Sequence, residues 1–296
     1  MNYKTSLKTS FKTAWIIVKL ILPIYILADV LFYYNVLSHV AFLFEPITAL
    51  LDLPIESALA IISGMFLNLY AAIAFAAPLD LTPKEWTVLA VYLGICHSLI
   101  VEGAIVKKLG FSLFYSYTLR IIAGLLVGYL TTLLPHSFFS DTIINQTIEA
   151  KNHASIFMLL ENSLSEAVIL TIKIILLITA LIFIMDFIKS LSFIKNSKKN
   201  VSKGFSLGVG VFLGITYGAG ILIQEAQSKS MSRSDLFYVT TFLLICHAII
   251  EDTLLFAIFG ANITLIIVVR TIAAIIIAWA LLKFYDRKHQ LAETTT

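Results

Sequence analysis

The stretch Ile95-Cys96-His97-Ser98-Leu99-Ile100 returns 150 residues later as Ile245-Cys246-His247-Ala248-Ile249-Ile250. At this offset, eight of the 29 positions from Ile95 to Ala123 are identical to their partners without a gap. The matched positions include charged residues, because Glu102 corresponds to Asp252 and Arg120 corresponds to Arg270. Repetition at a fixed spacing indicates one structural unit that is present twice. The sequence therefore predicts a chain built from two copies of a single unit.

The composition places these units in a lipid bilayer. Of the 296 residues, 59% are hydrophobic and only 13% are charged, and the mean hydropathy is +0.93. Such a chain has too few polar groups to cover the surface of a water-soluble domain. A spanning helix needs about 20 apolar residues, and we expect an all-α polytopic membrane protein because the long alternating pattern of a β-barrel is missing. Suitable apolar runs occur at Trp15 to Leu37, Ser57 to Pro78, Trp86 to Val106, Ser112 to Leu134, Ala167 to Ile188, Phe205 to Ile223, Leu236 to Phe259 and Leu265 to Leu282.

Several other functional classes find no support in the sequence. It has no cluster of basic residues interleaved with aromatic residues, which is typical of nucleic-acid binding. It also has no nucleophile motif, no histidine pair at metalloprotease spacing and no phosphate-binding glycine loop. We therefore expect a protein that is not an enzyme, uses no cofactor and has no nucleic-acid partner. Cys96 and Cys246 lie near the middle of predicted helices, where we expect them to pack as small apolar side chains.

Positive charge predicts how the chain is threaded through the bilayer. Lysine and arginine accumulate at four places, which the positive-inside rule assigns to the cytoplasm. If every apolar run crossed the bilayer, the last two of these places would lie on opposite sides. The run Phe205 to Ile223 is the best candidate for a segment that does not cross, because six glycines lie between Gly204 and Gly220 and favour a broken or re-entrant segment. The first basic place lies before Trp15. The other three lie at Lys107 and Lys108, from Lys189 to Lys203, and at Lys283, Arg287 and Lys288.

Treating Phe205 to Ile223 and its partner, Ser57 to Pro78, as re-entrant hairpins leaves six full crossings and makes the charge pattern consistent. Each copy then has three crossings and one hairpin, and the odd number of crossings inserts the second copy upside down. The predicted organisation is a first repeat (1–134), a polar connecting loop (135–162), a second repeat (163–289) and a disordered tail (290–296). The alternative is eight plain helices with an exception to the charge rule, since glycine is also common in ordinary membrane helices.

His97 and His247 lie deep in predicted spans. A helix rises about 1.5 Å per residue, so His97, eleven residues after Trp86, lies roughly 16 Å into a hydrocarbon core about 30 Å thick. His247 lies at the same depth in the second copy. A histidine at this depth can bind a proton, a cation or a polar group of a substrate. The alternative is a neutral imidazole that hydrogen-bonds to a neighbouring helix.

Two pairs of an acidic residue and an arginine are predicted across helical hairpins. Glu102 and Arg120 lie nine residues either side of Phe111, so helical rise places them at one depth, and Asp252 and Arg270 are related in the same way. An isolated charge is costly in hydrocarbon, which makes pairing the simplest explanation. A functional interpretation makes the pairs alternating gates, one toward the cytoplasm and one toward the outside. The structural interpretation is that they only hold the hairpins together.

Helical geometry also predicts where a proton or cation would bind. His97 and Glu102 are five residues apart, about 140° around a regular helix, and therefore do not share a face. Glu251 follows His247 by four residues and lies on the same face, so these two residues form the predicted site. Two ligands fall short of the three or four that transition metals usually take, so the sequence assigns no metal. Two amide side chains on or beside the hairpins could complete the site: Asn68 and Gln224.

Part of the chain resembles a known family. The residues that carry the resemblance are Leu53 to Ala60, Gly64, Asn68 to Ala72, His97 to Glu102, Lys107 to Gly110 and Arg120. They resemble the nucleoside recognition, or gate, domain family, which includes the spore maturation membrane proteins. The gate unit of that family is similar to the one duplicated in bacterial ferrous iron transporter B proteins. The resemblance is strongest from Leu53 to Leu134 and weaker from Lys203 to Leu282.

The resemblance implies an inner-membrane protein with paired gate units, similar in outline to concentrative nucleoside transporters with their re-entrant hairpins. It does not imply a nucleoside substrate. This chain lacks the soluble nucleotide-binding domain of the iron transporters, so the resemblance leaves an ion gradient as the energy source. At the offset of 150 residues, Asn68 and Tyr70 correspond to Gly218 and Gly220, and the resemblance therefore carries no substrate site into the second half.

Two functions are consistent with these features. The first is a secondary transporter or channel for a small polar solute or cation, with alternating access between two inverted gate repeats and with substrate near His97, His247 and the hairpins. The second is a non-transporting membrane assembly or maturation factor whose polar pairs hold helices together. We expect the chain in a bacterial inner membrane, surrounded by lipid, with both termini in the cytoplasm. The sequence leaves open whether it forms a homo-oligomer.

Overall fold

The computed structural model describes residues 3–34, 43–139, 155–190, 207–208, 210–212, 223 and 231–294. All regular secondary structure in these residues is helical. The described residues contain six helical segments that are long and apolar enough to cross a membrane, which equals the number of crossings expected from the charge pattern. The chain is therefore an all-α polytopic membrane protein, as predicted. The six segments are Ser6–Tyr33, Pro83–Lys108, Leu113–Thr132, Ile156–Ile188, Arg233–Ala257 and Ile263–Arg287.

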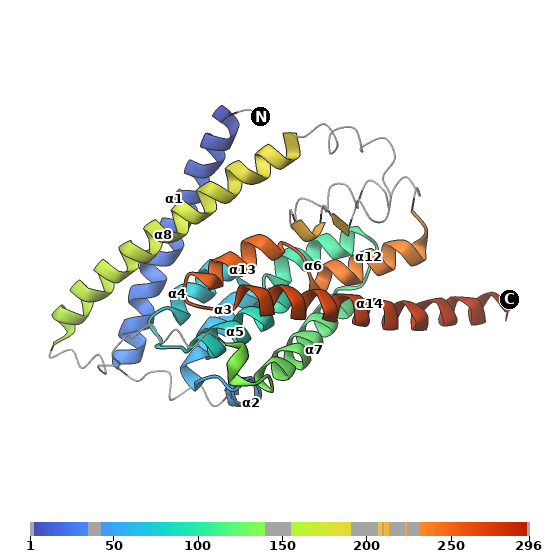
Figure 1. Ribbon diagram of the computed structural model, residues 1–296, viewed down its shortest axis with the longest axis horizontal. Helices are drawn as coiled ribbons and strands as arrows, with labels where there is room; N and C mark the ends of the chain where they lie inside the picture. Colours follow the sequence, from blue (N-terminus) through green and yellow to red (C-terminus); the bar gives the residue numbers. More distant parts are fainter. Residues whose placement is uncertain are drawn as a thin grey trace.

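Figure 1 shows the helices in chain order, and we group them here by the two predicted repeats. The first repeat contains α1 (Tyr3–Tyr33), α2 (Glu45–Leu50), η3 (Ile55–Ser57), α3 (Ala58–Phe66), α4 (Leu69–Ala76), α5 (Pro83–Cys96), α6 (Leu99–Lys108) and α7 (Leu113–Thr132), followed by η4 (His136–Phe138). The second contains α8 (Ile156–Ser190), α12 (Arg233–Ile245), α13 (Ile249–Ala257) and α14 (Ile263–Thr294).

Two predicted boundaries are wrong. α8 begins at Ile156, inside the segment predicted as a polar loop. α14 continues to Thr294, so residues 290–294 are helical and are not part of a disordered tail. No glycine or proline occurs between Ile263 and Thr294, and the sequence therefore contains no residue that would end this helix earlier.

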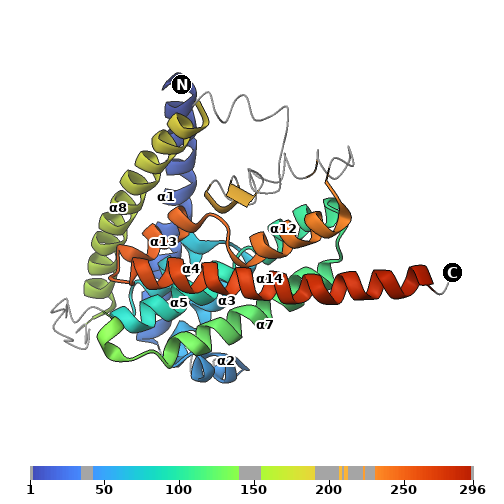
Figure 2. The same cartoon turned by 45° about the vertical axis from the view of Figure 1, so that its right-hand side comes forward.

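Equivalent helices of the two repeats run in opposite directions. The start of α1 meets the end of α8, where Ser6 Oγ donates a hydrogen bond to Asp186 Oδ2 at 2.7 Å. Toward the other end of the pair, Ser163 Oγ donates to the carboxylate of Asp29. The two helices lie side by side in both views (Figures 1 and 2). Since α1 and α8 are the first helices of the two copies, the second copy is inverted relative to the first.

The same inversion relates α5 and α12. The first turns of α5 lie beside the turn between α13 and α14, where the backbone N–H of Asn262 donates to Thr87 Oγ1 at 2.9 Å. The start of α12 lies beside the corresponding turn of the first repeat, where the ring centroids of Phe111 and Phe237 are 5.8 Å apart. α5 and α12 therefore begin at opposite ends of the molecule. Each turn has a residue with φ of 90°, a conformation that only glycine adopts readily: Gly110 and Gly260.

The first predicted hairpin, Ser57 to Pro78, consists of the short helices α3 and α4. They contain nine and eight residues, which at about 1.5 Å per residue is less than half of a hydrocarbon core about 30 Å thick. The second helix begins after Asn68, whose side chain accepts a hydrogen bond from the Ala71 N–H at 3.0 Å. The two helices pack against each other and against α1 and α5. This segment is therefore a helical hairpin that is too short to cross the bilayer.

The second predicted hairpin, Phe205 to Ile223, lies mostly outside the described residues. One described residue of this segment, Gly210, can still be aligned with the first hairpin. A Cβ added to Gly64 would meet the side chain of Leu93, and a Cβ added to Gly210 would meet that of Leu243. The leucines are 150 residues apart, whereas the glycines are 146 apart. Gly210 therefore takes the place of Gly64 at the shorter offset, whereas the predicted matches of Asn68 and Tyr70 at Gly218 and Gly220 lie outside the described residues.

The two most buried spans are interrupted in the middle. The sequence predicts continuous helices over Trp86 to Val106 and over Leu236 to Phe259, and this prediction is wrong. α5 is separated from α6 at His97 and Ser98, and α12 is separated from α13 at residues 246–248. The interruptions fall at equivalent places in the two copies, so they are part of the repeated unit.

The inverted arrangement predicts labelling from opposite faces. In a chain with Cys96 and Cys246 replaced by alanine, a single cysteine at Asp80→Cys should react with a membrane-impermeant maleimide from outside intact cells. A single cysteine at Arg233→Cys should react only after permeabilisation, because α5 and α12 begin at opposite ends. Lys107→Cys is the matched control and should behave like Arg233→Cys, since the turn after α6 lies beside the start of α12. Labelling of the first two variants from one face would contradict the inversion.

Candidate functional site

The interruptions in the two spans have the same backbone form. Ser98 has φ 48° and ψ 37°, and Ala248 has φ 46° and ψ 32°, in the left-handed region that residues other than glycine seldom adopt. The first hairpin supports one break, because the Ser98 N–H donates to the carbonyl oxygen of Gly64 at 2.9 Å and Ser98 Oγ donates to that of Leu67 at 3.3 Å. At the other break, the Ala248 N–H lies 3.5 Å from the carbonyl oxygen of Gly210. Each strained residue is thus held by a neighbouring segment.

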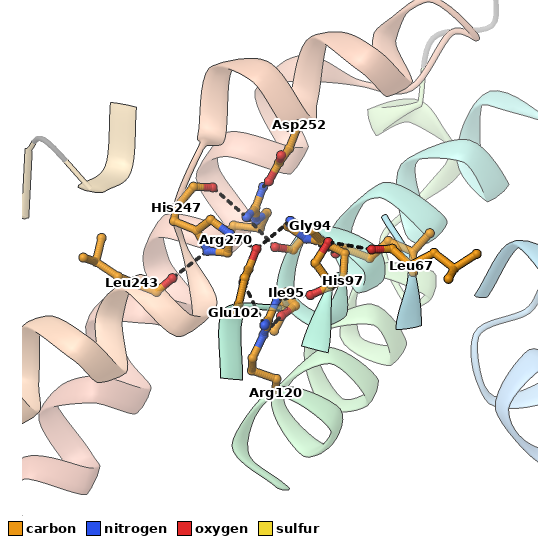
Figure 3. Close-up of polar contacts among 12 residues, drawn as sticks. Leu67, Gly94, Ile95, His97, Glu102, Arg120, Leu243, His247, Asp252 and Arg270 are labelled. Atoms are coloured by element: carbon orange, nitrogen blue, oxygen red, sulfur yellow. Dashed lines mark hydrogen bonds and ion pairs between the residues drawn. The ribbon is translucent and has the colours of Figure 1, made fainter. Parts of the chain in front are cut away.

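Buried arginines satisfy carbonyl groups that the breaks leave free. The last carbonyls of a helix have no partner within that helix, and hydrocarbon offers no water to replace one. Arg120, from α7, donates from Nε to the carbonyl oxygen of Ile95 and from Nη2 to that of His97, both at 2.6 Å. Arg270, from α14, donates from Nη2 to the carbonyl oxygen of His247 at 3.1 Å. Arg120 therefore caps the end of α5, and Arg270 binds a carbonyl inside the second break (Figure 3).

An acidic residue in the first turn of the following helix pairs with each arginine. Glu102 Oε2 lies 2.8 Å from Arg120 Nη1, and Asp252 Oδ2 lies 3.2 Å from Arg270 Nη1. The structure thus brings together both pairs that the sequence predicts. A carboxylate in the first turn also faces the positive end of the helix dipole, which stabilises it further. All four residues are buried, with none more than 5% exposed, and each charge has an opposite charge beside it.

The two pairs do not lie at opposite ends of the protein, as the gate interpretation requires. Glu102 Oε1 lies 3.1 Å from His247 Nε2, which belongs to the other repeat. A carboxylate oxygen of Asp252 lies within 4.8 Å of ring nitrogens of His97 and His247. The breaks therefore meet, and the two pairs surround one place instead of lying apart toward opposite faces. We call the following six residues the polar centre: His97, Glu102, Arg120, His247, Asp252 and Arg270.

Gly94 lets Arg270 reach from one repeat into the other. Arg270 Nη2 donates to the carbonyl oxygen of Gly94 at 2.5 Å, and a Cβ added to Gly94 would lie 2.7 Å from Arg270 Cζ. Leu244 occupies the corresponding position in the second repeat. Sequence reasoning missed Gly94, because glycine is common in membrane helices and only the fold shows which group approaches it.

The two histidines face each other inside the polar centre (Figure 3). Their ring centroids are 5.1 Å apart. Both Nε2 atoms lie near one oxygen, because Glu102 Oε1 is 3.2 Å from His97 Nε2 and 3.1 Å from His247 Nε2. The prediction that His97 and Glu102 are on different faces is therefore wrong. It assumed a continuous helix, whereas the break at Ser98 reorients the chain between them.

The hydrogen bonds of the histidines determine what can lie between them and Glu102. His97 Nδ1 is 2.8 Å from the carbonyl oxygen of Leu93, and His247 Nδ1 is 2.7 Å from that of Leu243. A carbonyl oxygen can only accept, so Nδ1 carries the hydrogen in both rings. Nε2 of a neutral ring then has a lone pair, and it faces a carboxylate oxygen that also has lone pairs. Each contact therefore requires a proton or another cation between the two atoms to be attractive.

The remaining predicted site residues have other positions. Glu251 Oε1 accepts a hydrogen bond from Tyr70 Oη at 3.1 Å, which links α13 to the hairpin helix α4. The prediction that Glu251 shares a helix face with His247 assumed a continuous helix, and the break at Ala248 removes that basis. Asn68 caps α4. Gln224 lies outside the described residues.

Comparison with known proteins supports the membrane assignment. The chain is 28% identical to the uncharacterized membrane protein YvoD of Bacillus subtilis (strain 168), over 94% of this chain and 93% of that protein. No family model matches the chain. No solved structure matches it. The chain is thus similar to a bacterial membrane protein along nearly its whole length, while the resemblance to the gate domain family stays a prediction.

Replacing Gly94 with alanine should destabilise the polar centre. The added methyl group would lie 2.7 Å from Arg270 Cζ, so the guanidinium must move and lose its bond to the Gly94 carbonyl. We expect the free energy of unfolding to fall by about 1–3 kcal/mol, observed as a lower apparent melting temperature in detergent. Gly208→Ala is the matched control, because a Cβ there meets nothing within 4 Å. Equal melting temperatures for the two variants would contradict the close approach of Arg270.

The capping role of Arg120 can be separated from its charge. Arg120→Met removes the arginine that pairs with the buried Glu102 and should lower the free energy of unfolding by about 3–5 kcal/mol. Adding Glu102→Gln removes the buried negative charge, but the two carbonyls that Arg120 bound still have no donor. We therefore expect the double variant to stay at least about 1 kcal/mol less stable than the unaltered chain, as measured by denaturant titration followed by circular dichroism. Full recovery in the double variant would show that Arg120 only balances charge.

Proposed function

We propose that this chain is a secondary transporter or channel for a small polar solute or a cation, which passes through the polar centre between two inverted gate repeats. The proposal places the protein in the bacterial inner membrane with both termini in the cytoplasm. It assigns the chain no enzymatic reaction, and its partners are the solute or ion and the surrounding lipid.

The observation that carries the proposal is the meeting of two broken helices at one polar centre. Each break gives up backbone hydrogen bonds and uses a left-handed residue, Ser98 or Ala248. A protein that only had to span the bilayer would be more stable with continuous helices. Discontinuous helices from inverted repeats are a known way to present main-chain and side-chain ligands near the middle of a membrane. The breaks are therefore best explained as features of a binding site.

The hairpin formed by α3 and α4 supports the proposal because it contacts broken helices of both repeats. Near the turn of the hairpin, the carbonyl oxygens of Gly64 and Leu67 accept hydrogen bonds from Ser98 at the first break. In α4, Tyr70 donates to Glu251 of the second repeat. A shift of this hairpin would change its contacts with both broken helices together. Such a movement would open the polar centre toward one side.

The described conformation is closed around the polar centre. None of its six residues is more than 7% exposed. A solute can therefore reach the centre only when the protein opens, first toward one face and then toward the other. In an inverted repeat, the two open forms are related by the internal symmetry, because each half can adopt the conformation of the other.

Native cysteines can report this opening. Cys96 and Cys246 directly precede the two histidines and are fully buried, and they are the only cysteines in the chain. Cys246→Ala and Cys96→Ala each leave one reporter. In metal-free buffer, we expect a charged, membrane-impermeant thiol reagent to modify each reporter both in right-side-out and in inverted vesicles, because each opening admits water to the centre. The rate of modification is measured by mass spectrometry of the intact protein.

The control is a cysteine that faces lipid, Leu176→Cys, placed in a chain without the native pair. Leu176 is 66% exposed on α8, and the charged reagent should not reach it within the hydrocarbon core. Reporters that react from one face alone, or only after denaturation, would contradict alternating access. Such a result would favour the non-transporting assembly factor, for which a closed polar centre is sufficient.

A further inference from the structure

We propose that the polar centre binds a divalent first-row transition metal ion, with His97 and His247 as nitrogen ligands and Glu102 and Asp252 as oxygen ligands. This inference rests on the proposed function and deepens it by naming the class of cation that passes through the centre. Each repeat supplies one histidine and one carboxylate. Neither repeat alone has enough ligands to hold such an ion.

The ligand atoms lie in two groups that share the histidines, one with Asp252 and the other with Glu102. One ligand atom from each of His97, His247 and Asp252 lies within 4.8 Å of the other two. Glu102 Oε1 is 3.2 Å and 3.1 Å from the Nε2 atoms of the two histidines. Ions such as zinc bind nitrogen and oxygen at about 2.0–2.2 Å, so neighbouring ligand atoms of a tetrahedral site are roughly 3.3–3.6 Å apart. Small side-chain movements would therefore complete the site.

Both histidines are oriented as metal ligands before any ion binds. Their Nδ1–H groups donate to the carbonyl oxygens of Leu93 and Leu243, four residues earlier on the same helices. This bond fixes the ring and leaves the lone pair of Nε2 directed into the centre. The two lone pairs and Glu102 Oε1 form a group of acceptors that only a positive particle can hold together.

The carboxylates are held by arginines in a way that leaves them able to bind an ion. Glu102 pairs with Arg120 through Oε2 and presents Oε1 to the histidines. Asp252 pairs with Arg270 through Oδ2, and a carboxylate has a second oxygen. Partners of this kind orient ligating carboxylates and are a regular part of metal sites.

The ligand set selects the class of ion. Two imidazoles with two carboxylates suit divalent zinc, iron, cobalt or manganese, whereas calcium and magnesium prefer oxygen ligands alone. Charge limits the affinity, because Arg120 and Arg270 already balance Glu102 and Asp252, so the ion adds positive charge to a buried centre. Binding should therefore be weaker than at a structural zinc site. Weaker binding suits an ion that must leave the site as well as enter it.

Cobalt chloride tests the site at equilibrium in the purified full chain in detergent. We expect the visible absorption typical of tetrahedral Co²⁺, saturating at one ion per chain. His247→Asn should lower the affinity by roughly 100-fold or more and abolish this absorption. The asparagine amide can keep the hydrogen bond to the Leu243 carbonyl, but it has no atom in the place of Nε2. His97→Asn is the equivalent second variant, and a melting curve without metal verifies that each variant is folded.

His136→Asn is the matched control, because His136 is exposed and lies outside the polar centre, and it should bind Co²⁺ like the unaltered chain. Absence of tetrahedral absorption in the unaltered chain, or undiminished binding in a folded His97→Asn or His247→Asn variant, would overturn the metal site. The Co²⁺ titration is carried out in detergent without a membrane, and the cysteine labelling is carried out without metal. The two experiments therefore test the metal site and the transporter separately. Missing Co²⁺ binding therefore counts against the ion, whereas unreactive cysteines count against the transporter.

Discussion

Two helices end inside this membrane protein, and their free carbonyl groups must find donors where no water is available. α5 ends at Cys96 and α12 at Ile245. A buried carbonyl without a partner costs about 1–3 kcal/mol, so the breaks depend on two arginines: Arg120 donates to the end of α5, and Arg270 donates to the His247 carbonyl inside the second break. Each arginine in turn needs a carboxylate, because an unpaired buried charge would cost more. The polar centre is thus, first of all, a consequence of breaking two buried helices.

The same arrangement also gathers acceptor atoms from both repeats around one place. A carboxylate that holds an arginine through one oxygen still has another, and at Glu102 this oxygen faces both His97 and His247. Because both rings use Nδ1–H for backbone bonds, only acceptors meet in the middle. The inverted symmetry brings one histidine and one carboxylate from each half to this place. Each arginine that donates to the backbone pairs with one oxygen of a carboxylate, and the other oxygen is left for the cation that we propose.

The two halves differ where the polar centre meets its surroundings. Gly94 admits the guanidinium of Arg270, whereas its counterpart is Leu244. Glu251, whose counterpart is the apolar Val101, accepts a hydrogen bond from Tyr70 of the hairpin. An inverted carrier needs halves that can exchange conformations, not halves that are identical. The two halves therefore differ in charge at position 251 and in packing at Gly94.

The sequence by itself determined the helical membrane fold, the inverted repeat, the hairpin at Ser57 to Pro78 and the two acid–arginine pairs, because composition, charge and spacing act locally or through the bilayer. The breaks were not evident, since neither Ser98 nor Ala248 is a glycine or proline. Predictions that carried helical periodicity across them therefore failed. Only the tertiary structure decided that Glu102 faces His247, 145 residues away in the chain, because that contact depends on how the broken helices of the two repeats meet.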